Sequence, residues 1–395
     1  MVCPEKGNGG LVSNPGSARH RVGTGRERVL VIVLAGGAGG RLAPLTDRRA
    51  KPSLPFGGMY RLIDIALSQV AHSGMRDVWV VEQYEPHALN DHLANGRPWD
   101  LDRTHGGLQI LPPFQRSDGD EAMASGNADA LVQQRHLIAE MAPDVVLSMS
   151  ADHVFRLDLR DVLETHAGTR ARLTIVTTDL PSEDDPSRFG WVNVDDGAVT
   201  GFEYKPDEPS GDRVCTEVFA FDGPELLARL AALAELDSAG DYGDRLVPGL
   251  VADGDVVEHR LQGYWRDVGT IDAYYRAHMD LVCDDPPLRL DDPAWPLLTG
   301  SLIGGPARIG ARAETVGCLL SPGVIVEGVV EGSVLARNAV VEAGAVVRAS
   351  VVLDDAVIRT GAVVESAIVD VGASVGVHDQ GRREEGWAVT VYPVQ

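Results

Sequence analysis

Short apolar runs alternate with amphipathic stretches over residues 29–275. The run Val29–Ala35 is apolar throughout, which is typical of a strand buried on both faces of a sheet. Residues 61–73 carry their apolar side chains at helical spacing, and residues 127–140 form a second helical pattern with Asn127 as the predicted N-cap. Strands that alternate with helices favour an α/β fold with a mostly parallel sheet and helices on both faces. Further strands are predicted at residues 77–82, 144–149 and 172–177.

The pattern changes after residue 300, where aliphatic residues recur every six positions and Ala, Gly and Ser fill the gaps. This step fits neither an α-helix nor a flat strand. It is typical of a left-handed parallel β-helix, in which each six-residue side of a triangular coil directs one aliphatic side chain inward. A valine-rich sandwich would instead need two-residue alternation with turn signals about every ten residues, which this segment lacks. One series is Val334, Val340, Val346, Val352, Ile358 and Val364, and a second is Val351, Val357, Val363, Val369 and Val375.

These patterns divide the chain into four parts. Residues 1–28 are rich in Gly, Pro, Ser and Arg and predict a flexible arm. They lack the apolar core of a signal peptide, which favours a cytoplasmic location. Residues 29–283 form the predicted α/β domain, and residues 284–300 contain four prolines, which predicts a linker without regular helix or central strand. Residues 301–395 form the predicted β-helix domain and tail.

Composition and charge narrow the class of partner. The 395 residues are 44% hydrophobic and 24% charged, which is enough apolar material for packed cores. Lys plus Arg number 35 against 58 for Asp plus Glu, so the net charge is −23 at pH 7. A protein that binds nucleic acid needs a basic face, so nucleic acid is not expected as a partner. The apolar runs are too short to span a bilayer, so a membrane is not expected as a partner either. A small anionic substrate remains compatible, because a few local cations can hold it.

A glycine-rich loop follows the first predicted strand, at the edge where open parallel sheets bind ligands. Its backbone N–H groups can turn onto phosphate oxygens, and Arg41 and Lys51 follow as cations that can neutralise a polyphosphate. Leu42 stands where the dinucleotide fingerprint needs its last glycine, and no Gly-Lys-Ser/Thr closes the loop as a Walker motif would. The alternative interpretation is that this glycine-rich loop is only a tight connection between two elements and binds no ligand. The glycines predicted to bind a nucleotide are Gly36, Gly37, Gly39 and Gly40.

Two aspartates lie near other predicted strand ends. Asp152 follows the strand at 144–149, and Asp267 lies beside Arg266 before a glycine turn. If both reach one pocket, their carboxylates would chelate Mg²⁺ together with phosphate oxygens. Each aspartate alone is better explained as a cap or turn residue, so the metal hypothesis depends on the two meeting.

Three weaker candidates complete the site. Lys205 lies at a strand end, where its compact cation could hold a monophosphate, although a single surface lysine is usually only solvated. Gln83 and the turn at 125–130, which contains Gly126, offer amide and backbone groups suited to the edge of a nucleobase.

These residues stand in long motifs whose order and spacing resemble the glucose-1-phosphate adenylyltransferase (ADP-glucose pyrophosphorylase) family over roughly residues 29–377. The motifs are LAGGAGGRLAPLTDRRAKPSLPFGGMYRLIDIALS, QYEPH, SGNADA, ADHVF and YWRDVGT, followed by the proline-rich linker and the six-residue repeats. The resemblance implies a Rossmann-like nucleotidyltransferase domain followed by a C-terminal left-handed parallel β-helix. It also implies a homo-oligomer, either a tetramer or a dimer.

The resemblance further implies that a sugar 1-phosphate attacks the α-phosphorus of a nucleoside triphosphate in line, with Mg²⁺ as cofactor, and that pyrophosphate leaves. Because the nucleophile is already an anion, no general base is required, and catalysis consists of positioning and charge neutralisation. The roles carried over are triphosphate binding for residues 36–41 and Lys51, base recognition for Gln83 and Gly126, metal binding for Asp152 and Asp267, sugar-phosphate binding for Lys205, and catalysis for Arg41, Lys51 and Asp152.

Two positions depart from the family's usual motifs. Tyr204 replaces the acid of F-x-E-K-P, and Glu217 occupies the glycine position of S-M-G-x-Y-x-F, so both are predicted to face the substrate. One interpretation is a changed acceptor, such as a cyclitol 1-phosphate of the valienol type used in antibiotic biosynthesis. The other is neutral drift with glucose kept. The identity of the nucleobase also stays open, because amide and backbone groups can bind either adenine or guanine.

Two further classes compete with a catalytic transferase. A regulatory paralogue without activity would be expected to lose Asp152, Lys51 or Arg41, and all three are present. A β-helix acyltransferase would place a histidine between coils, and no histidine occurs from Leu302 to Val377. The catalytic transferase is therefore favoured.

Overall fold

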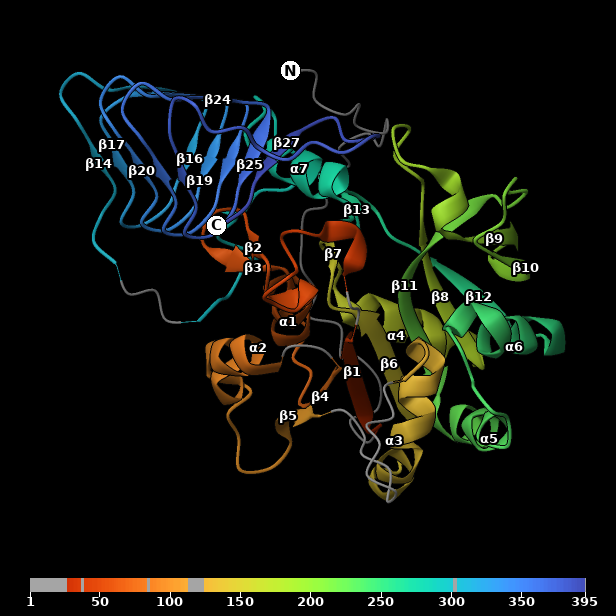
Figure 1. Cartoon of the computed structure of the whole chain (residues 1–395). Coiled ribbons are helices and arrows are strands. Elements are labelled where there is room, and N and C mark those ends of the chain that lie inside the picture. The colour runs from red at the N-terminus through yellow and green to blue at the C-terminus, as the bar shows by residue number, and fades with distance from the viewer. Residues whose placement is uncertain (1–26, 37–38, 84–85, 113–123, 301–303, 395) are drawn as a thin grey trace, which may run out of the picture.

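A twisted sheet with helices on both faces is joined to a β-helix (Figure 1). The computed structural model describes residues 27–36, 39–83, 86–112, 124–300 and 304–394. Within these ranges, no helix is long and apolar enough to cross a membrane.

The sheet has the strand order β5-β4-β1-β6-β11-β8-β12-β10-β9. The continuously apolar β1 lies inside it and pairs in parallel with β4 and β6, as expected for a strand buried on both faces. The strands are β1 (Val29–Ala35), β4 (Asp77–Glu82), β5 (Gly107–Leu111), β6 (Val145–Ser150), β8 (Leu173–Thr178), β9 (Gly190–Asp195), β10 (Ala198–Tyr204), β11 (Arg213–Asp222) and β12 (Val256–Arg260).

The expected parallel pairing holds for β5, β4, β1 and β6 and for β8 with β12, but β11 and β10 run in the opposite direction. Strand β11 pairs antiparallel with both β6 and β8, and β10 pairs antiparallel with β9 and β12. The reversal comes from the two-residue turn Asp196-Gly197 between β9 and β10, where both residues have positive φ as a tight hairpin requires. The chain then returns along β11 through the middle of the sheet.

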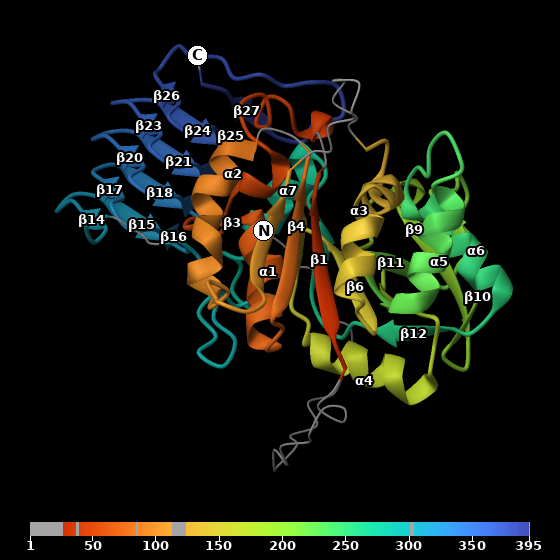
Figure 2. The ribbon, with the colours of Figure 1, turned by 90° about the horizontal axis from the view of Figure 1, so that it is seen from below.

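Helices cover both faces of the sheet, and each face has its own apolar core. Figure 2 shows α1 and α2 on the side that faces the β-helix and α3 and α5 on the other side. Helix α3 begins at Asn127, but its N-cap is Gly126 and not Asn127 as predicted. The Asn127 N–H donates to Asp241 Oδ1 at 3.0 Å. The helices are α1 (Leu62–His72), α2 (Pro86–Leu93), α3 (Asn127–Met141), α4 (Leu159–Thr169), α5 (Gly223–Leu233), α6 (Val247–Asp253) and α7 (Ile271–Met279).

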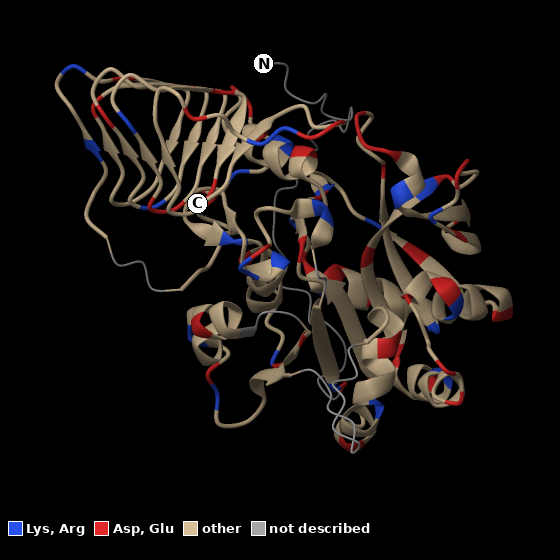
Figure 3. Ribbon diagram, in the orientation of Figure 1, with Lys and Arg blue, Asp and Glu red and all other residues tan. Residues whose placement is uncertain are grey.

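The C-terminal coils stack three parallel sheets around an aliphatic interior. Charged residues are scarce along these stacked strands in Figure 3. The sheets are β14 (Arg308–Ile309), β17 (Ile325–Val326), β20 (Val340–Val341), β23 (Val357–Ile358) and β26 (Ser374–Val375); β15 (Glu314–Val316), β18 (Val329–Glu331), β21 (Val346–Arg348) and β24 (Val363–Glu365); and β16 (Leu319–Leu320), β19 (Val334–Leu335), β22 (Val351–Val352), β25 (Ala367–Val369) and β27 (Thr390–Tyr392).

The strict six-residue step needs a correction. Val340 pairs with Val357 and Val334 with Val351, so these coils advance 17 residues, because one of their three sides is one residue shorter than the other two. The coil before them is shorter still, since Ile325 pairs with Val340 after 15 residues. Each predicted series therefore changes face along the helix. Val340 is a half-buried outward residue, whereas Val352 of the same series lies in the interior.

One face of the β-helix packs on the α/β domain. Val334, Val351 and Ile368 point out of the coils and belong to the core cluster that also contains α1. Arg61 Nη2 lies 2.7 Å from Asp354 Oδ2 across this contact, so apolar burial and an ion pair both hold the two domains together.

The linker and the tail both return to the α/β domain. The segment 284–300 contains no helix or strand and lies along α1, where the Trp295 indole donates to Gln69 Oε1 at 2.8 Å. The tail crosses from the coils to the start of α7, where the Ala388 N–H donates to Asp272 Oδ1 at 2.9 Å. The tail therefore reaches the same edge of the sheet as the glycine-rich loop.

Candidate functional site

Two aspartates from distant parts of the chain meet beside one lysine. Asp152 precedes β7 (His153–Phe155), and Asp267 ends β13 (Trp265–Asp267). The two strands pair antiparallel with Asp267 opposite His153, which brings the carboxylates together. Lys51, from the 3-10 helix Lys51–Ser53, donates its ammonium to Asp152 Oδ2 and lies 3.6 Å from Asp267 Oδ1. The structure thus brings Asp152 and Asp267 together, as the metal hypothesis requires, and places Lys51 between them.

Lys51 and Asp152 each stabilise the charged form of the other. Burial alone would lower the pKa of Lys51, but Asp152 and Asp267 outweigh this and hold the pKa above its ordinary value. Burial likewise works to raise the pKa of Asp152, but the Lys51 ammonium and a hydrogen bond from Ser150 Oγ hold it well below the usual range. A fixed cation and two carboxylates therefore face one another in a partly enclosed place.

The donor chemistry of the pair fits Mg²⁺. The ion prefers carboxylate oxygens, and in nucleotide sites it takes one or two of them with substrate phosphates and water as the other ligands. The Asp152 and Asp267 side chains are 20% and 13% exposed, so their oxygens remain within reach of a ligand. Among the described residues, no group of three or more His, Cys, Asp or Glu could hold a metal by itself.

Close packing explains two glycines of the loop. A β-carbon on Gly36 would lie 2.7 Å from Cδ of Gln83, so the predicted base-reading amide lies directly against the loop. Gly39 has φ of 64°, and a β-carbon there would come within 2.9 Å of Thr46 and 3.2 Å of the Lys51 β-carbon. A β-carbon on Gly40 would meet nothing within 4 Å, so packing does not require that glycine. Gly37 lies outside the described residues.

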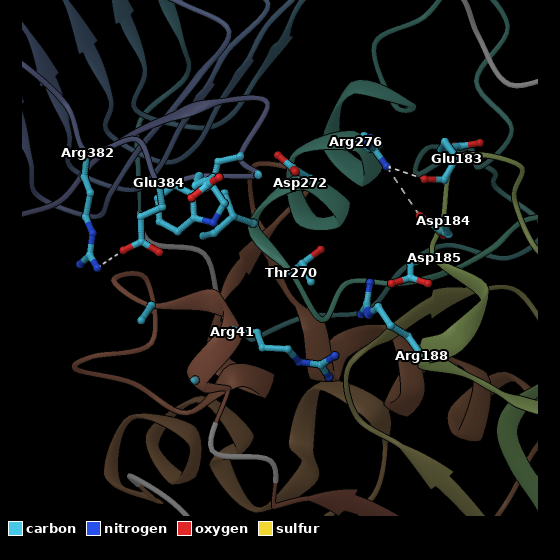
Figure 4. A pocket seen from close by; sticks show the side chains of 16 residues that line it. Arg41, Glu183, Asp184, Asp185, Arg188, Thr270, Asp272, Arg276, Arg382 and Glu384 are labelled. Carbon is cyan, nitrogen blue, oxygen red and sulfur yellow. Dashed lines mark hydrogen bonds and ion pairs between the residues drawn. The ribbon is translucent and has the colours of Figure 1, made fainter. Parts of the chain in front are cut away.

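A pocket of about 590 Å³ opens at the end of this loop, within the usual size range of ligand sites. Arg41 and Arg188 both point into it in Figure 4. Its other walls come from the segment 183–188, the first turns of α7 and the tail, including Glu384 and Trp387. The contribution of the tail was not predicted from the sequence.

A hydrogen-bonded chain links the predicted acceptor residues to the predicted base-binding turn. Lys205 Nζ donates to the Tyr204 hydroxyl at 2.5 Å, and that hydroxyl donates to Asp241 Oδ2 at 2.5 Å. The other oxygen of Asp241 accepts from the Asn127 N–H. Gly126 packs on the backbone next to Asp241, since a β-carbon there would lie 2.4 Å from the Gly240 carbonyl carbon. Lys205, Tyr204 and Gly126 therefore lie around Asp241.

Glu217 sits in a bulge of β11, where the register shifts between Cys215 and Phe219. Its φ is +58°, a left-handed conformation that strains a residue with a β-carbon. Burial raises the pKa of its carboxyl, and Asp152 and Asp267 raise it further, while His153 opposes them. Glu217 is therefore close enough to Asp152 and Asp267 for their charges to act on its carboxyl. It also lines a small cavity of about 20 Å³ with Asn127, Gly190, Phe202, Tyr204, Cys215, Phe219, Asp241, Tyr242 and Gly243.

Three residues of the site were not predicted from the sequence. Arg188 Nη2 lies 2.8 Å from Asp267 Oδ2. His153 Nε2 lies 3.7 Å from Asp152 and 3.8 Å from Asp267, and its Nδ1 lies 3.0 Å from the Thr216 carbonyl. Asp241 is the third. Each comes from a loop or strand end without a periodic pattern, and its role depends on contacts with residues far away in the chain.

Comparison with known families agrees with this architecture. Residues 30–283 match the family described as Nucleotidyl transferase, and residues 306–381 match the family described as GlmU-like, C-terminal hexapeptide. The predicted fold class is therefore confirmed, as a nucleotidyltransferase domain followed by a left-handed parallel β-helix. The fold and the site define a sugar-1-phosphate nucleotidylyltransferase.

Curated relatives narrow the class further. The chain is 36% identical over 314 residues to a glucose-1-phosphate adenylyltransferase of Clostridium beijerinckii, covering 79% of this chain and 81% of the relative. Enzymes of the same name from Clostridium novyi and Fusobacterium nucleatum are each 38% identical, covering 78% of this chain and 81% of each relative. The chain belongs to the glucose-1-phosphate adenylyltransferase family. These relatives do not favour the cyclitol alternative.

Proposed function

We propose that the protein transfers an adenylyl group from ATP to glucose 1-phosphate, giving ADP-glucose and pyrophosphate, with Mg²⁺ as cofactor. The observation that carries the proposal is the meeting of Asp152 and Asp267 around Lys51, beside the glycine-rich loop. The names of the three relatives support the choice of ATP and glucose 1-phosphate.

The reaction needs positioning and charge neutralisation. A phosphate oxygen of glucose 1-phosphate attacks the α-phosphorus, and the bond from that phosphorus to the β-phosphate oxygen breaks in line, so pyrophosphate leaves with the electron pair. Lys51 and Arg41 neutralise the charge that develops on the phosphates. Mg²⁺, when held by Asp152 and Asp267, adds Lewis-acid stabilisation of the same charge. The acceptor oxygen is already ionised, so no side chain needs to remove a proton.

The remaining roles follow from the two subsites. Gln83, against Gly36, and the turn at Gly126 read the base, and the loop at Gly36, Gly39 and Gly40 binds the triphosphate through its N–H groups. Lys205 binds the phosphate of the acceptor. Tyr204, Asp241 and Glu217 form the side of the site that meets sugar hydroxyls, where hydrogen-bonding groups discriminate strongly between acceptors.

A pyrophosphate-release assay tests the proposal. ATP, GTP, UTP and dTTP are each paired with glucose, galactose and mannose 1-phosphates in the presence of Mg²⁺. We expect ATP with glucose 1-phosphate to give the highest kcat/KM. A clear preference for another nucleotide or another sugar phosphate would contradict this substrate pair, and no release with any pair would contradict the catalytic role itself.

A homo-oligomer, either a tetramer or a dimer, stays a prediction from the family resemblance, and a cytoplasmic location stays a prediction from the sequence. Light scattering coupled to size-exclusion chromatography measures the first, and a mass of one chain in solution would contradict it.

A further inference from the structure

The two oxygens of the Asp267 carboxylate have different partners. Oδ1 faces the Lys51 ammonium at 3.6 Å, and Oδ2 accepts from Arg188 Nη2 at 2.8 Å. One oxygen therefore faces the aspartate cluster, and the other is occupied on the opposite side by a guanidinium. This division fixes the rotation of the carboxylate about its last bond.

Arg188 itself is held firmly. It ends the 3-10 helix Pro186–Arg188, which Asp185 caps by accepting from the Ser187 N–H at 3.0 Å. Its guanidinium carbon lies 5.5 Å from the centre of the Phe189 ring, and the side chain is only 16% exposed. A cation that rests on a ring and is largely buried loses little further freedom when it binds a carboxylate.

The backbone is shaped to admit this ion pair. A β-carbon on Gly269 would lie 2.9 Å from Arg188 Nη2 and 2.9 Å from Asp267 Oδ1. A side chain at position 269 would therefore press on both partners. Gly269 is therefore required by packing, because only a residue without a side chain leaves room for both Arg188 and Asp267.

We infer that Arg188 is a positioning residue that holds the Asp267 carboxylate in the orientation needed for Mg²⁺. This inference rests on the proposed function, in which Asp267 is a metal ligand. Hydrogen-bonded partners that orient a ligating side chain typically change metal affinity by about 10- to 100-fold when removed. Arg188 acts through Asp267, so its loss weakens binding of the metal and leaves binding of the acceptor sugar phosphate unchanged.

The test measures metal binding directly. Mn²⁺ is titrated calorimetrically into the full-length protein with α,β-methylene-ATP present, for wild type, Arg188→Met, Arg188→Lys and Asp267→Asn. Binding is corrected for the Mn²⁺ taken up by the nucleotide alone. We expect about 10- to 100-fold weaker Mn²⁺ binding for Arg188→Met, a smaller loss for Arg188→Lys because a lysine keeps the charge but not the planar fork, and a larger loss for Asp267→Asn than for either arginine variant. In turnover assays, kcat of Arg188→Met should recover as Mg²⁺ is raised, with KM for glucose 1-phosphate unchanged.

Two controls separate the possible failures. Arg160→Met removes an arginine of α4 that is 45% exposed and paired with Asp158, the N-cap of that helix, and the variant should bind Mn²⁺ as wild type does. Wild-type binding by Asp267→Asn would overturn the metal role of Asp267 and with it the proposed function. Weakened binding in Asp267→Asn with wild-type affinity in Arg188→Met would overturn only the role of Arg188. A kcat of Arg188→Met that stays low at saturating Mg²⁺ would also overturn it.

Discussion

Asp152 and Asp267 face the same ammonium group, that of Lys51, although the first precedes β7 and the second ends β13. Their meeting depends on the short antiparallel pair β7 and β13, which places His153 opposite Asp267. Neither strand belongs to the main sheet. The two-stranded pair therefore acts as the frame of the candidate active site, and changes to either acid are expected to affect catalysis far more than folding.

The first prediction concerns Asp152. We expect Asp152→Ala to lower kcat by about 10³-fold or more, because a charge-neutralising and metal-binding group is lost. The fold should remain intact, since the side chain is partly exposed and lies at a strand end. Pyrophosphate release and far-ultraviolet circular dichroism measure the two effects. Asp195→Ala, at an exposed hairpin position, is the matched control, and a near-normal rate for Asp152→Ala would contradict the assignment.

The second prediction concerns the strain at Glu217. Glu217→Gly and Glu217→Ala both remove the carboxylate, but only glycine adopts φ of +58° without strain. We therefore expect the glycine variant to be more stable than the alanine variant by about 1 kcal/mol. Chemical denaturation measures the difference. If alanine were as stable as glycine, the bulge would not be strained in solution.

Much of this architecture could be predicted from local patterns. The apolar run of β1 and the helical spacing of α1 lie where the sequence indicated, because burial on one or two faces leaves a periodic trace. Asp152 and Lys51 could also be found, because each stands in a motif beside a strand end.

Other features of the fold and the site could not be predicted from local sequence patterns. The position of β11 between β6 and β8 depends on pairing between strands that are far apart in the chain. The Asp196-Gly197 hairpin turn indicates locally that the chain reverses, but the apolar strand patterns do not show this reversal. The ion pair of Arg188 with Asp267 joins the end of a short 3-10 helix to the end of β13, and no periodic pattern in the sequence indicates it. A coil of 17 residues is one residue shorter than a coil with three equal six-residue sides. Over a short stretch of sequence, the two kinds of coil show the same six-residue spacing.

The third prediction concerns the Tyr204 hydroxyl. It accepts from Lys205 and donates to Asp241, and burial together with the hydrogen bond to Asp241 raises its pKa, so the proton stays on the hydroxyl. Tyr204→Phe leaves Lys205 without this contact. We expect KM for glucose 1-phosphate to rise about tenfold, since hydrogen bonds to charged groups contribute about 1.5–3 kcal/mol.

The KM for ATP is the internal comparison for that variant, and it should change by less than about threefold. Tyr392→Phe, on β27 of the β-helix, removes a hydroxyl far from the acceptor residues and should leave both constants unchanged. An unchanged KM for glucose 1-phosphate in Tyr204→Phe would mean that the chain through Asp241 does not contribute to acceptor binding.

The last prediction is a pH dependence of stability that arises at Glu82, the final residue of β4. The side chain is 1% exposed, both of its carboxyl oxygens are buried, and the Asn90 side chain is the polar group that opposes the effect of this burial on its pKa. Burial raises the pKa of this carboxyl to about 7. The folded protein therefore keeps a proton that the unfolded chain releases at lower pH. The stabilising contribution is fully present below the unfolded pKa and is lost as the pH rises to about 7.

Between pH 5.5 and pH 8 this loss amounts to about 2 kcal/mol of unfolding free energy. Glu82→Gln has nearly the same shape but no proton to lose, so its stability should exceed that of wild type by a margin that grows by about 2 kcal/mol across this range. Chemical denaturation at several pH values measures the difference, and all other titrating groups cancel in it. Glu208→Gln, at an exposed loop position, should give a flat difference. A flat difference for Glu82→Gln as well would show that the carboxyl titrates normally, and that water or a rearranged side chain satisfies it in solution.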